Sequence, residues 1–327
     1  DISFMTQIPA FAAVSRSFGY LRGLRIKDKK LHVAHPRARI SLDHSFFKSV
    51  FSGVQLYAYF VVVSALRLFR SPGERKTIAF YPHSAPPWYN IWLVSQISDL
   101  KITSDVNTAD TIFVFEDETY SSSARRLTQN QRQRALNHRI EDISKTHVGT
   151  VFEKVFGYSL TVDPLTYEGE AVCKSDLNGT HDGKIVACPI PAQDLEEGAI
   201  YQRFIDSAND GERSEDLRTA IVKGAIPTVF HKFKALDARF GTSYLHTDVR
   251  AANEVFTSDE QSLIAEFCRE IGLDFGCIDI MRDIKDDRIY IVDVNKTCMP
   301  VLSLSFKEQM KALRLMGGSL RAAITEE

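Results

Sequence analysis

The sequence predicts an α/β protein with more than one domain. Two apolar strand-like stretches, TIAFY (77–81) and TIFVFED (111–117), flank a proline-marked turn that enters a helix at APPWYNIW. Further along, apolar strands alternate with charged turns. A helix is predicted over 259–272, where Leu263, Ile264, Phe267 and Ile271 recur at helical spacing. The 327 residues suffice for about two domains.

Composition and charge exclude several protein classes. The apolar fraction of 44% and the charged fraction of 25% exclude a disordered tail, a collagen-like fibre and a small disulfide scaffold. The net charge of −2 argues against a nucleic-acid partner. Residues 1–70 nevertheless carry 11 Lys/Arg against 3 Asp/Glu, a net charge of +8. This basic segment predicts a local anionic partner.

The five cysteines indicate a reducing compartment. Their number is odd and no two have CxxC spacing, so neither a disulfide framework nor a zinc-binding pair is expected. No secretory signal is visible at the start of this sequence. We therefore expect a cytoplasmic protein, with membrane association left open by the segment described next.

Residues 49–66, SVFSGVQLYAYFVVVSAL, contain no charge, and Lys48, Arg67 and Arg70 flank them. As a helix they would be about 27 Å long, close to the ~30 Å hydrocarbon core of a bilayer. Two serines, a glycine and a glutamine dilute the run, which favours a buried or oligomer-forming helix over a membrane-interface helix or a true span. We accordingly predict membrane-surface contact or homo-oligomer formation through residues 1–70.

Stretches rich in proline, glycine or polar residues divide the rest of the chain. SPGERK (71–76) opens a small α/β domain over 71–130, and the polar stretch RRLTQNQRQRALNHRIEDISK is compatible with a helical linker. EAVCKS (170–175), KIVACPI and AIYQRFID (199–206) are predicted strands. Residues 217–233 are predicted to form a hairpin that turns near Lys223 and Gly224, and FGCIDIMRD and RIYIVDVN two strands joined by a short turn.

The strongest chemical signal lies in those last two strands. Asp279 is on the first, and Asp293 and Asn295 are on the second at alternate positions, so that the side chains of Asp293 and Asn295 share one face. Oxygen ligands on paired strands suit Mg²⁺. A carboxylate inside an apolar strand is unfavourable unless it is paired or metal-bound. A hydrogen-bonded carboxylate at a sheet edge is the structural alternative.

This constellation resembles the ATP-grasp superfamily, whose active site is closed by two strands of the pattern acid … acid-x-Asn. The resemblance covers about residues 130–300 and implies a carboxylate–amine ligase-like fold preceded by a small α/β domain. It divides the chain into a basic N-terminal segment (1–70), the small domain (71–130) and an ATP-grasp domain (131–327). The last splits into a central part, about 145–205, and a C-terminal part, about 206–327.

The resemblance also implies a nucleotide site. Lys145 and Lys174 match its two ATP lysines, and the loop SDLNGTHDGK, with Gly179 and Gly183, matches its phosphate-covering loop. Backbone groups at the adenine hinge are expected to read the base; that hinge is Gln202, Arg203 and Phe204.

Arg218 in LRTAIVKG matches a phosphate or acyl-phosphate contact, with an ion pair to Glu215 as its structural alternative. Asp279, Asp293 and Asn295 would hold Mg²⁺, two ions in this family. Lys296, just beyond Asn295, is a candidate contact for an anionic acceptor.

The reaction implied by the resemblance uses ATP to convert a carboxylate to an acyl phosphate, which an amine, thiol or similar nucleophile then attacks. Lys174 and Arg218 are the expected catalytic residues, and the partners are small-molecule carboxylates and nucleophiles. Two alternatives stay open. One is an ATP-grasp kinase that phosphorylates a hydroxyl and needs a dense basic pocket, and the other is a non-catalytic nucleotide-binding, membrane-associated protein.

Overall fold

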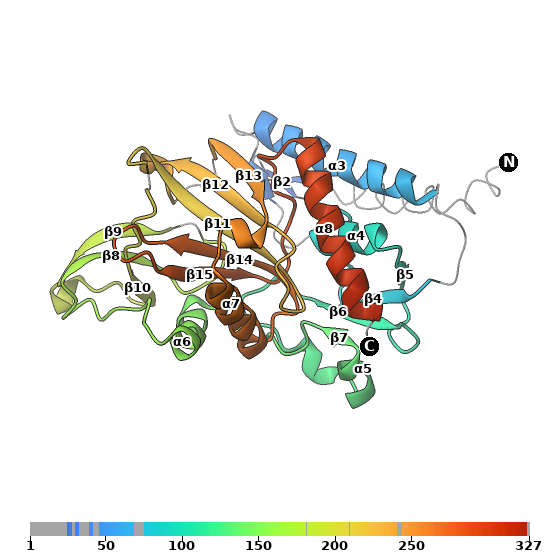
Figure 1. Cartoon of the computed structure of the whole chain (residues 1–327), viewed down its shortest axis with the longest axis horizontal. Helices are drawn as coiled ribbons and strands as arrows, with labels where there is room; N and C mark the ends of the chain where they lie inside the picture. The colour runs from blue at the N-terminus through green and yellow to red at the C-terminus, as the bar shows by residue number, and fades with distance from the viewer. Residues whose placement is uncertain are drawn as a thin grey trace.

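The structure, a computed structural model, has the predicted α/β class (Figure 1). The described residues are 25–27, 30–32, 39–41, 46–68, 75–180, 182–208, 210–240 and 244–325. Residues 1–24, which hold two of the 11 Lys/Arg of the predicted basic segment, lie outside this set. Three short strands, β1 (Arg25–Lys27), β2 (Lys30–His32) and β3 (Arg39–Ser41), form an antiparallel sheet ahead of the main body.

A parallel sheet forms the first large unit. Its strands run in the order β5-β4-β6-β7 and are all parallel. They are β4 (Thr77–Pro82), β5 (Lys101–Thr103), β6 (Thr111–Phe115) and β7 (Ala135–Leu136). Every residue of β6 is buried, as expected for a strand covered on both faces. The predicted helix begins later than its proline turn, as α4 (Asn90–Ile97).

The polar stretch after β6 differs from its prediction as a helical linker. It forms a 3₁₀ turn η1 (Ser123–Arg126), one short helix α5 (Gln129–Gln133) and then β7. Thr128 is the N-cap of α5. Its side chain accepts a hydrogen bond from Gln131 N, and the side chain of Gln131 accepts one from Thr128 N in return. The chain therefore returns to the parallel sheet as β7 before it continues into the second half.

The uncharged run lies within helix α3 (Phe46–Leu68), which packs on the first unit. Tyr59 stacks on Phe306 with ring centroids 5.2 Å apart, and Phe60 lies 5.2 Å from Trp92. The opposite side of the helix leaves Val54 and Val61 exposed. Within the described part of the chain, no helix combines the length and apolarity needed to cross a membrane. Membrane contact and oligomer formation through residues 1–70 stay predictions.

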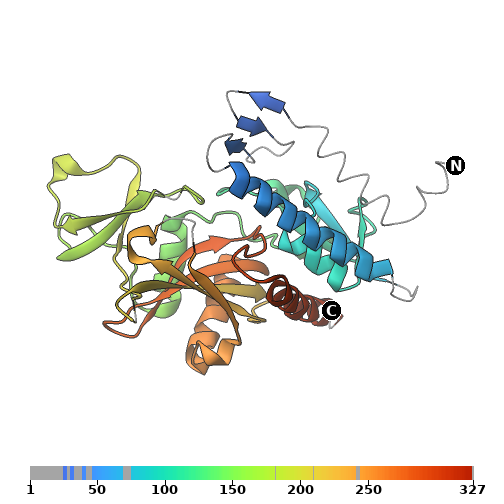
Figure 2. The same ribbon diagram turned by 90° about the horizontal axis from the view of Figure 1, so that it is seen from above.

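A small antiparallel sheet, here called the lid sheet, projects from the second half of the chain (Figure 2). Its strands, in the order β10-β8-β9, are β8 (Gly169–Ser175), β9 (Lys184–Cys188) and β10 (Ala199–Arg203). The 3₁₀ turn η2 (Ala192–Asp194) connects β9 to β10. The sheet follows helix α6 (Lys145–Phe156), which Ser144 caps and Gly157 ends in a left-handed conformation.

The five-stranded antiparallel sheet β13-β12-β11-β14-β15 forms the centre of the second half. Its strands are β11 (Arg213–Val222), β12 (Val229–Ala235), β13 (His246–Arg250), β14 (Phe275–Arg282) and β15 (Ile289–Asn295). The β11–β12 turn falls at Lys223 and Gly224, both at positive φ, as predicted. The turns η3 (Leu236–Ala238) and η4 (Ala252–Glu254) and helix α7 (Ser258–Ile271) complete it.

The two faces of this sheet differ. One face buries Leu217, Ile221 and Ile278 in a core shared with α6 and α7. The other face buries Ala220 and Phe275 in the core shared with the first unit. Helix α8 (Phe306–Thr325) belongs to this second core and packs against α4, where Gly317 allows close approach to Ile97. The predicted domain boundaries themselves stay predictions.

Candidate active site

A row of charged side chains crosses the five-stranded sheet. Arg218 on β11 is directly opposite Asp279 on β14, and Asp279 is directly opposite Asp293 on β15. Arg218 Nη1 lies 3.3 Å from Asp279 Oδ2 and 3.4 Å from Oδ1. Asn295 Nδ2 donates to Asp279 Oδ2 at 3.1 Å. The structure thus brings together the predicted metal ligands and the predicted phosphate contact.

The predicted structural alternative for Arg218 does not occur. Glu215 accepts instead from His231, with Nε2 and Oε2 2.7 Å apart. Residues 215 and 218 are three apart along β11, so their side chains point to opposite faces of the sheet. Arg218 is therefore directed toward Asp279 and the face that carries the candidate metal ligands.

The two carboxylates have opposite electrostatic environments. Burial favours the neutral form of Asp279, but Arg218, followed by Lys232 and Lys234, outweighs it and holds the pKa of Asp279 below its ordinary value. Burial and then the neighbouring Asp279 raise the pKa of Asp293 to about 6, although Lys145, Lys174 and Arg218 act in the other direction. Asp279 is therefore a paired carboxylate that stays ionised. Asp293 is harder to ionise, because burial and the charge of Asp279 both favour its neutral form.

The same residues fit a divalent cation that prefers oxygen. Asp293 Oδ1 is buried and has no hydrogen-bond partner, which is the state expected of a ligand atom whose cation is not part of the protein. Asp279, Asp293 and Asn295 supply two carboxylates and one amide oxygen, a donor set that suits Mg²⁺. Among the described residues no group of three or more His, Cys, Asp and Glu side chains could hold a metal, so the amide is needed to complete the set.

The two predicted ATP lysines approach this row from the central part of the chain. Lys145 is the first residue of α6, is buried, and donates from Nζ to the carbonyl of Leu177. Lys174 is on β8, where burial lowers its pKa to about 8 despite the opposing effect of Asp293. Both lysines lower the pKa of Asp293, which puts them within electrostatic reach of the metal ligands.

The loop between β8 and β9 covers the same region. Gly179 has φ +75°, so a side chain there would be strained. Gly183 faces Phe240, whose ring carbon would lie 3.0 Å from an added Cβ. Asn178 ties the loop to two distant elements, because its N–H donates to Thr119 Oγ1 at 3.0 Å and its amide to the carbonyl of Val294.

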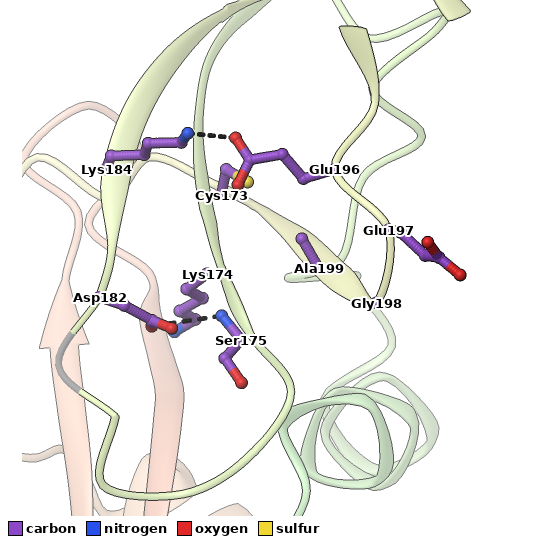
Figure 3. Close-up of a pocket in the computed structure, with 9 residues that line it drawn as sticks. All are labelled: Cys173, Lys174, Ser175, Asp182, Lys184, Glu196, Glu197, Gly198 and Ala199. Atoms are coloured by element: carbon purple, nitrogen blue, oxygen red, sulfur yellow. Dashed lines mark hydrogen bonds and ion pairs between the residues drawn. The ribbon is translucent and has the colours of Figure 1, made fainter. Parts of the chain in front are cut away.

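A cavity of about 260 Å³ opens on the lid sheet, and only part of its lining belongs to the predicted nucleotide site (Figure 3). Lys174 and Cys173 are consecutive on β8 and so point to opposite faces. Figure 3 shows Lys174 and Asp182 on one side and the Lys184–Glu196 ion pair beside Cys173 on the other. The face that carries Lys174 is the one of interest, since it alone is in reach of Asp293.

The three predicted hinge residues have different surroundings. Gln202 is buried, and its Nε2 has no hydrogen-bond partner. Arg203 extends away to the hydroxyl of Tyr290 at 2.6 Å and to Asp283 at 3.6 Å. Its side chain thus links the lid sheet to the five-stranded sheet. The N–H groups of Arg203 and Phe204 donate to the carbonyls of Leu160 and Glu170, so a base would have to be read by other backbone groups of the hinge.

One predicted acceptor contact needs revision, and two further lysines were not predicted. Lys296, the candidate for an anionic acceptor, is buried and donates to Ser121 Oγ in the first unit. The sequence analysis missed Lys232 and Lys234, which are buried on β12 near Arg218. Their signal was available, because lysines at alternate positions of the apolar strand VFHKFKA must share one face.

No protein-family model matches the chain, and no curated protein matches its sequence. Solved structures do match. PsnB, an ATP-grasp ligase complexed with a phosphomimetic variant of minimal precursor, Mg and ADP, has a TM-score of 0.45 at 10% identity. This match covers 78% of the present chain and 100% of PsnB. A RiPP-associated ATP-grasp ligase from Chryseobacterium gregarium, in complex with ADP and a leader and core peptide, has a TM-score of 0.46 at 12% identity, over 77% and 97% of the two chains.

The L-amino acid ligase from Bacillus licheniformis has a TM-score of 0.43 at 12% identity, over 77% of this chain and 75% of that one. Two of these three structures are named as ATP-grasp ligases, the superfamily that the motifs resemble. Identities of 10–12% and TM-scores of 0.43–0.46 support no conclusion about the activity of this chain. The chemistry has to be argued from the residues themselves.

Proposed function

We propose that the protein is an ATP- and Mg²⁺-dependent ligase that activates a carboxylate as an acyl phosphate for attack by an amine or a similar nucleophile. One observation carries the proposal. Arg218, Asp279 and Asp293 stand in register across three strands, and Lys145 and Lys174 reach the same point from another part of the chain. Such convergence of phosphate-binding cations and cation-binding carboxylates is what phosphoryl transfer requires.

The residues have distinct tasks in this proposal. Lys174 and Lys145 bind the phosphates of ATP, and the loop with Gly179 and Gly183 closes over them. Asp279, Asp293 and Asn295 hold Mg²⁺, two ions if the family pattern applies, and the bound metal neutralises the phosphate oxygens. Gln202, Arg203 and Phe204 border the adenine, with the side chain of Arg203 fixing the hinge to Tyr290.

Arg218 is placed to stabilise the group that is transferred. An oxygen of the acceptor carboxylate attacks the γ-phosphorus, the bond from this phosphorus to the bridging oxygen of ADP breaks, and negative charge collects on the transferred oxygens. Arg218 is only loosely paired with Asp279, at 3.3 and 3.4 Å, so its guanidinium retains donors for those oxygens. The nucleophile then attacks the acyl carbon, inorganic phosphate leaves, and the nucleophile loses its proton.

The experiment is acyl-phosphate trapping. The protein is incubated with ATP, Mg²⁺ and hydroxylamine against panels of small carboxylates and of polyols, and ADP release and hydroxamate formation are measured. A ligase gives both products with at least one carboxylate and neither with polyols. ADP release with polyols and no hydroxamate would establish a kinase instead. Nucleotide binding without turnover on either panel would establish a non-catalytic protein.

The kinase alternative has one observation in its favour. Lys232 and Lys234 add two buried positive charges beside Arg218, which is the start of a basic pocket. Asp216, however, neutralises Lys234 at 3.0 Å, and Asp279 is paired with Arg218. The remaining charge is too small for a substrate with several phosphates, and the ligase proposal therefore stands first.

A further inference from the structure

The lysines of β12 extend the candidate active site beyond the metal ligands. Lys232 is opposite Asp216 of β11 and Lys234 is opposite Ser214, so both share the face that carries Arg218. Only 3% of Lys232 and 9% of Lys234 is exposed. Strand β12 lies beyond β11 as seen from β14, which puts it two strand spacings, roughly 10 Å, from the strand that carries Asp279.

Lys234 is satisfied by the protein itself. Its Nζ lies 3.0 Å from Asp216 Oδ2 and donates to the carbonyl of Arg239 at 3.1 Å. The ring of Tyr244, centred 5.1 Å away, adds a cation–π contact. A buried ammonium with a carboxylate, a carbonyl and an aromatic face has a complete set of partners.

The side chain of Lys232 is as deeply buried as that of Lys234 but has fewer polar partners. Its Nζ donates to the hydroxyl of Tyr244 at 3.3 Å and lies 4.6 Å from the centre of the same ring. No carboxylate of the described residues lies within the 4.0 Å limit of an ion pair. An ammonium has three donors, and burying one without a counter-ion is strongly unfavourable unless an anion arrives from outside.

We propose that Lys232, together with the hydroxyl of Tyr244, binds a second anionic group of the acceptor, a carboxylate or a phosphate, apart from the carboxylate that is phosphorylated beside Arg218. This inference rests on the proposed ligase function and narrows its substrates to molecules with two anionic groups. The ATP phosphates do not fill this role, because Lys145 and Lys174 bind them at the opposite edge of the sheet, next to Asp293.

Stability separates this role from a structural one. In Lys232→Met the stem stays packed, and the ammonium that is removed has no carboxylate within ion-pair distance and only a longer-range attraction to Asp279, so the melting temperature should stay the same or rise. In Lys234→Met, Asp216 loses its partner, and the melting temperature should fall. A large fall in Lys232→Met would show that Lys232 is a structural cation and would overturn the proposal.

Anion binding tests the site directly. The protein, saturated with a non-hydrolysable ATP analogue and Mg²⁺, is titrated calorimetrically with inorganic phosphate and, separately, with acetate. We expect millimolar binding of at least one anion, weakened at least tenfold in Lys232→Met and unchanged in Lys311→Met, a control on the exposed face of α8. Tighter phosphate binding indicates a phosphate-bearing acceptor, and tighter acetate binding a dicarboxylate.

The same titration distinguishes the two levels of failure. If the wild-type protein does not bind the ATP analogue, the ligase proposal fails, and the anion titration is repeated without nucleotide to judge Lys232 alone. If the analogue binds but neither anion distinguishes the wild type from Lys232→Met, the second anion site fails and the ligase proposal survives. Once an acceptor is known, Lys232→Met should raise its KM at least tenfold with kcat nearly unchanged.

Discussion

One face of the five-stranded sheet has a candidate metal end, with Asp279 and Asp293, and a basic end, with Lys232 and Lys234. Their charges are arranged in a similar way. At the metal end, Asp279 is paired with Arg218, while Asp293 has a buried oxygen without a partner. At the basic end, Lys234 is paired with Asp216, while Lys232 has only a hydroxyl and an aromatic ring. Each end thus contains one charge that the protein satisfies and one that it does not. We infer from this comparison that an unsatisfied buried charge, rather than burial as such, marks a candidate position for a ligand.

Replacing Asp293, whose buried Oδ1 has no hydrogen-bond partner, should have the largest effect on activity. Asp293→Asn keeps the size of the side chain but weakens cation binding, so we expect turnover to fall by on the order of 10³-fold. The measurement is ADP release at saturating ATP and Mg²⁺. Asp259→Asn, an exposed change in the first turn of α7, is the matched control and should leave turnover unchanged. Activity within a few-fold of wild type would make the metal end structural.

Lys174 should contribute mainly to nucleotide affinity. Lys174→Met removes a charge-assisted contact to phosphate, and we expect the Kd for Mg-ATP to rise roughly 10–100-fold. Lys184→Met is a sharp control, because Lys184 is on the neighbouring strand but pairs with Glu196 on the other face of the lid sheet. Equal weakening by both substitutions would show that nucleotide affinity depends on the lid sheet in general and not on Lys174.

The pH dependence of kcat/KM for ATP should reflect the lowered pKa of Lys174. Its pKa is about 8, lowered by burial and by Lys145 and raised by Asp293 and Asp182. Between about pH 6, the pKa of Asp293, and pH 8 the ammonium is charged and kcat/KM for ATP should be flat. Above pH 8 it should fall about tenfold per pH unit as the charge is lost. Lys174→Arg should retain its charge and remove this alkaline limb. A limb that persists in Lys174→Arg would belong to another group.

The free energy of unfolding should respond in opposite directions to substitution of Asp293 and of Asp279, with the two variants about 3–6 kcal/mol apart. The pKa of Asp293 is raised, to about 6, so the nucleotide-free protein should lose stability as the pH rises from 4 to 6 and keep that loss at pH 7.5. Asp293→Asn should therefore raise the free energy of unfolding at pH 7.5 by about 1–2 kcal/mol. Asp279→Asn should lower it by about 2–4 kcal/mol, because Arg218 loses its partner. Urea unfolding of both variants makes the test, and the same sign for both would contradict the comparison.

The sequence predicted the metal end better than the basic end, for a physical reason. Strand alternation and the adjacency of two strands suffice to bring Asp279, Asp293 and Asn295 together. Asp216 forms an ion pair with Lys234 although Lys232 is the residue directly opposite it on β12. The predicted turn at Lys223 and Gly224 therefore does not tell which lysine is paired, because this depends on how the side chains pack in the folded hairpin.

Other elements were missed because their partners are far away in the sequence. Lys296 follows Asn295 in the chain, but its side chain reaches Ser121 in the first unit, 175 residues earlier. Helix α8 likewise ends the chain and packs against α4 of the first unit. Arg203 has the pattern of a hinge residue, yet its guanidinium binds Tyr290. Local patterns identify the elements, and long-range packing decides which side chains remain available for a ligand.

The most direct test of the central claim is a crystal structure with Mn²⁺ and a non-hydrolysable ATP analogue, read by anomalous difference density. We expect a metal peak within about 2.0–2.3 Å of Asp293 Oδ1, with the phosphates of the analogue between the metal and Lys174. Bound nucleotide with no metal at Asp293, and a protein donor on Oδ1 instead, would contradict it.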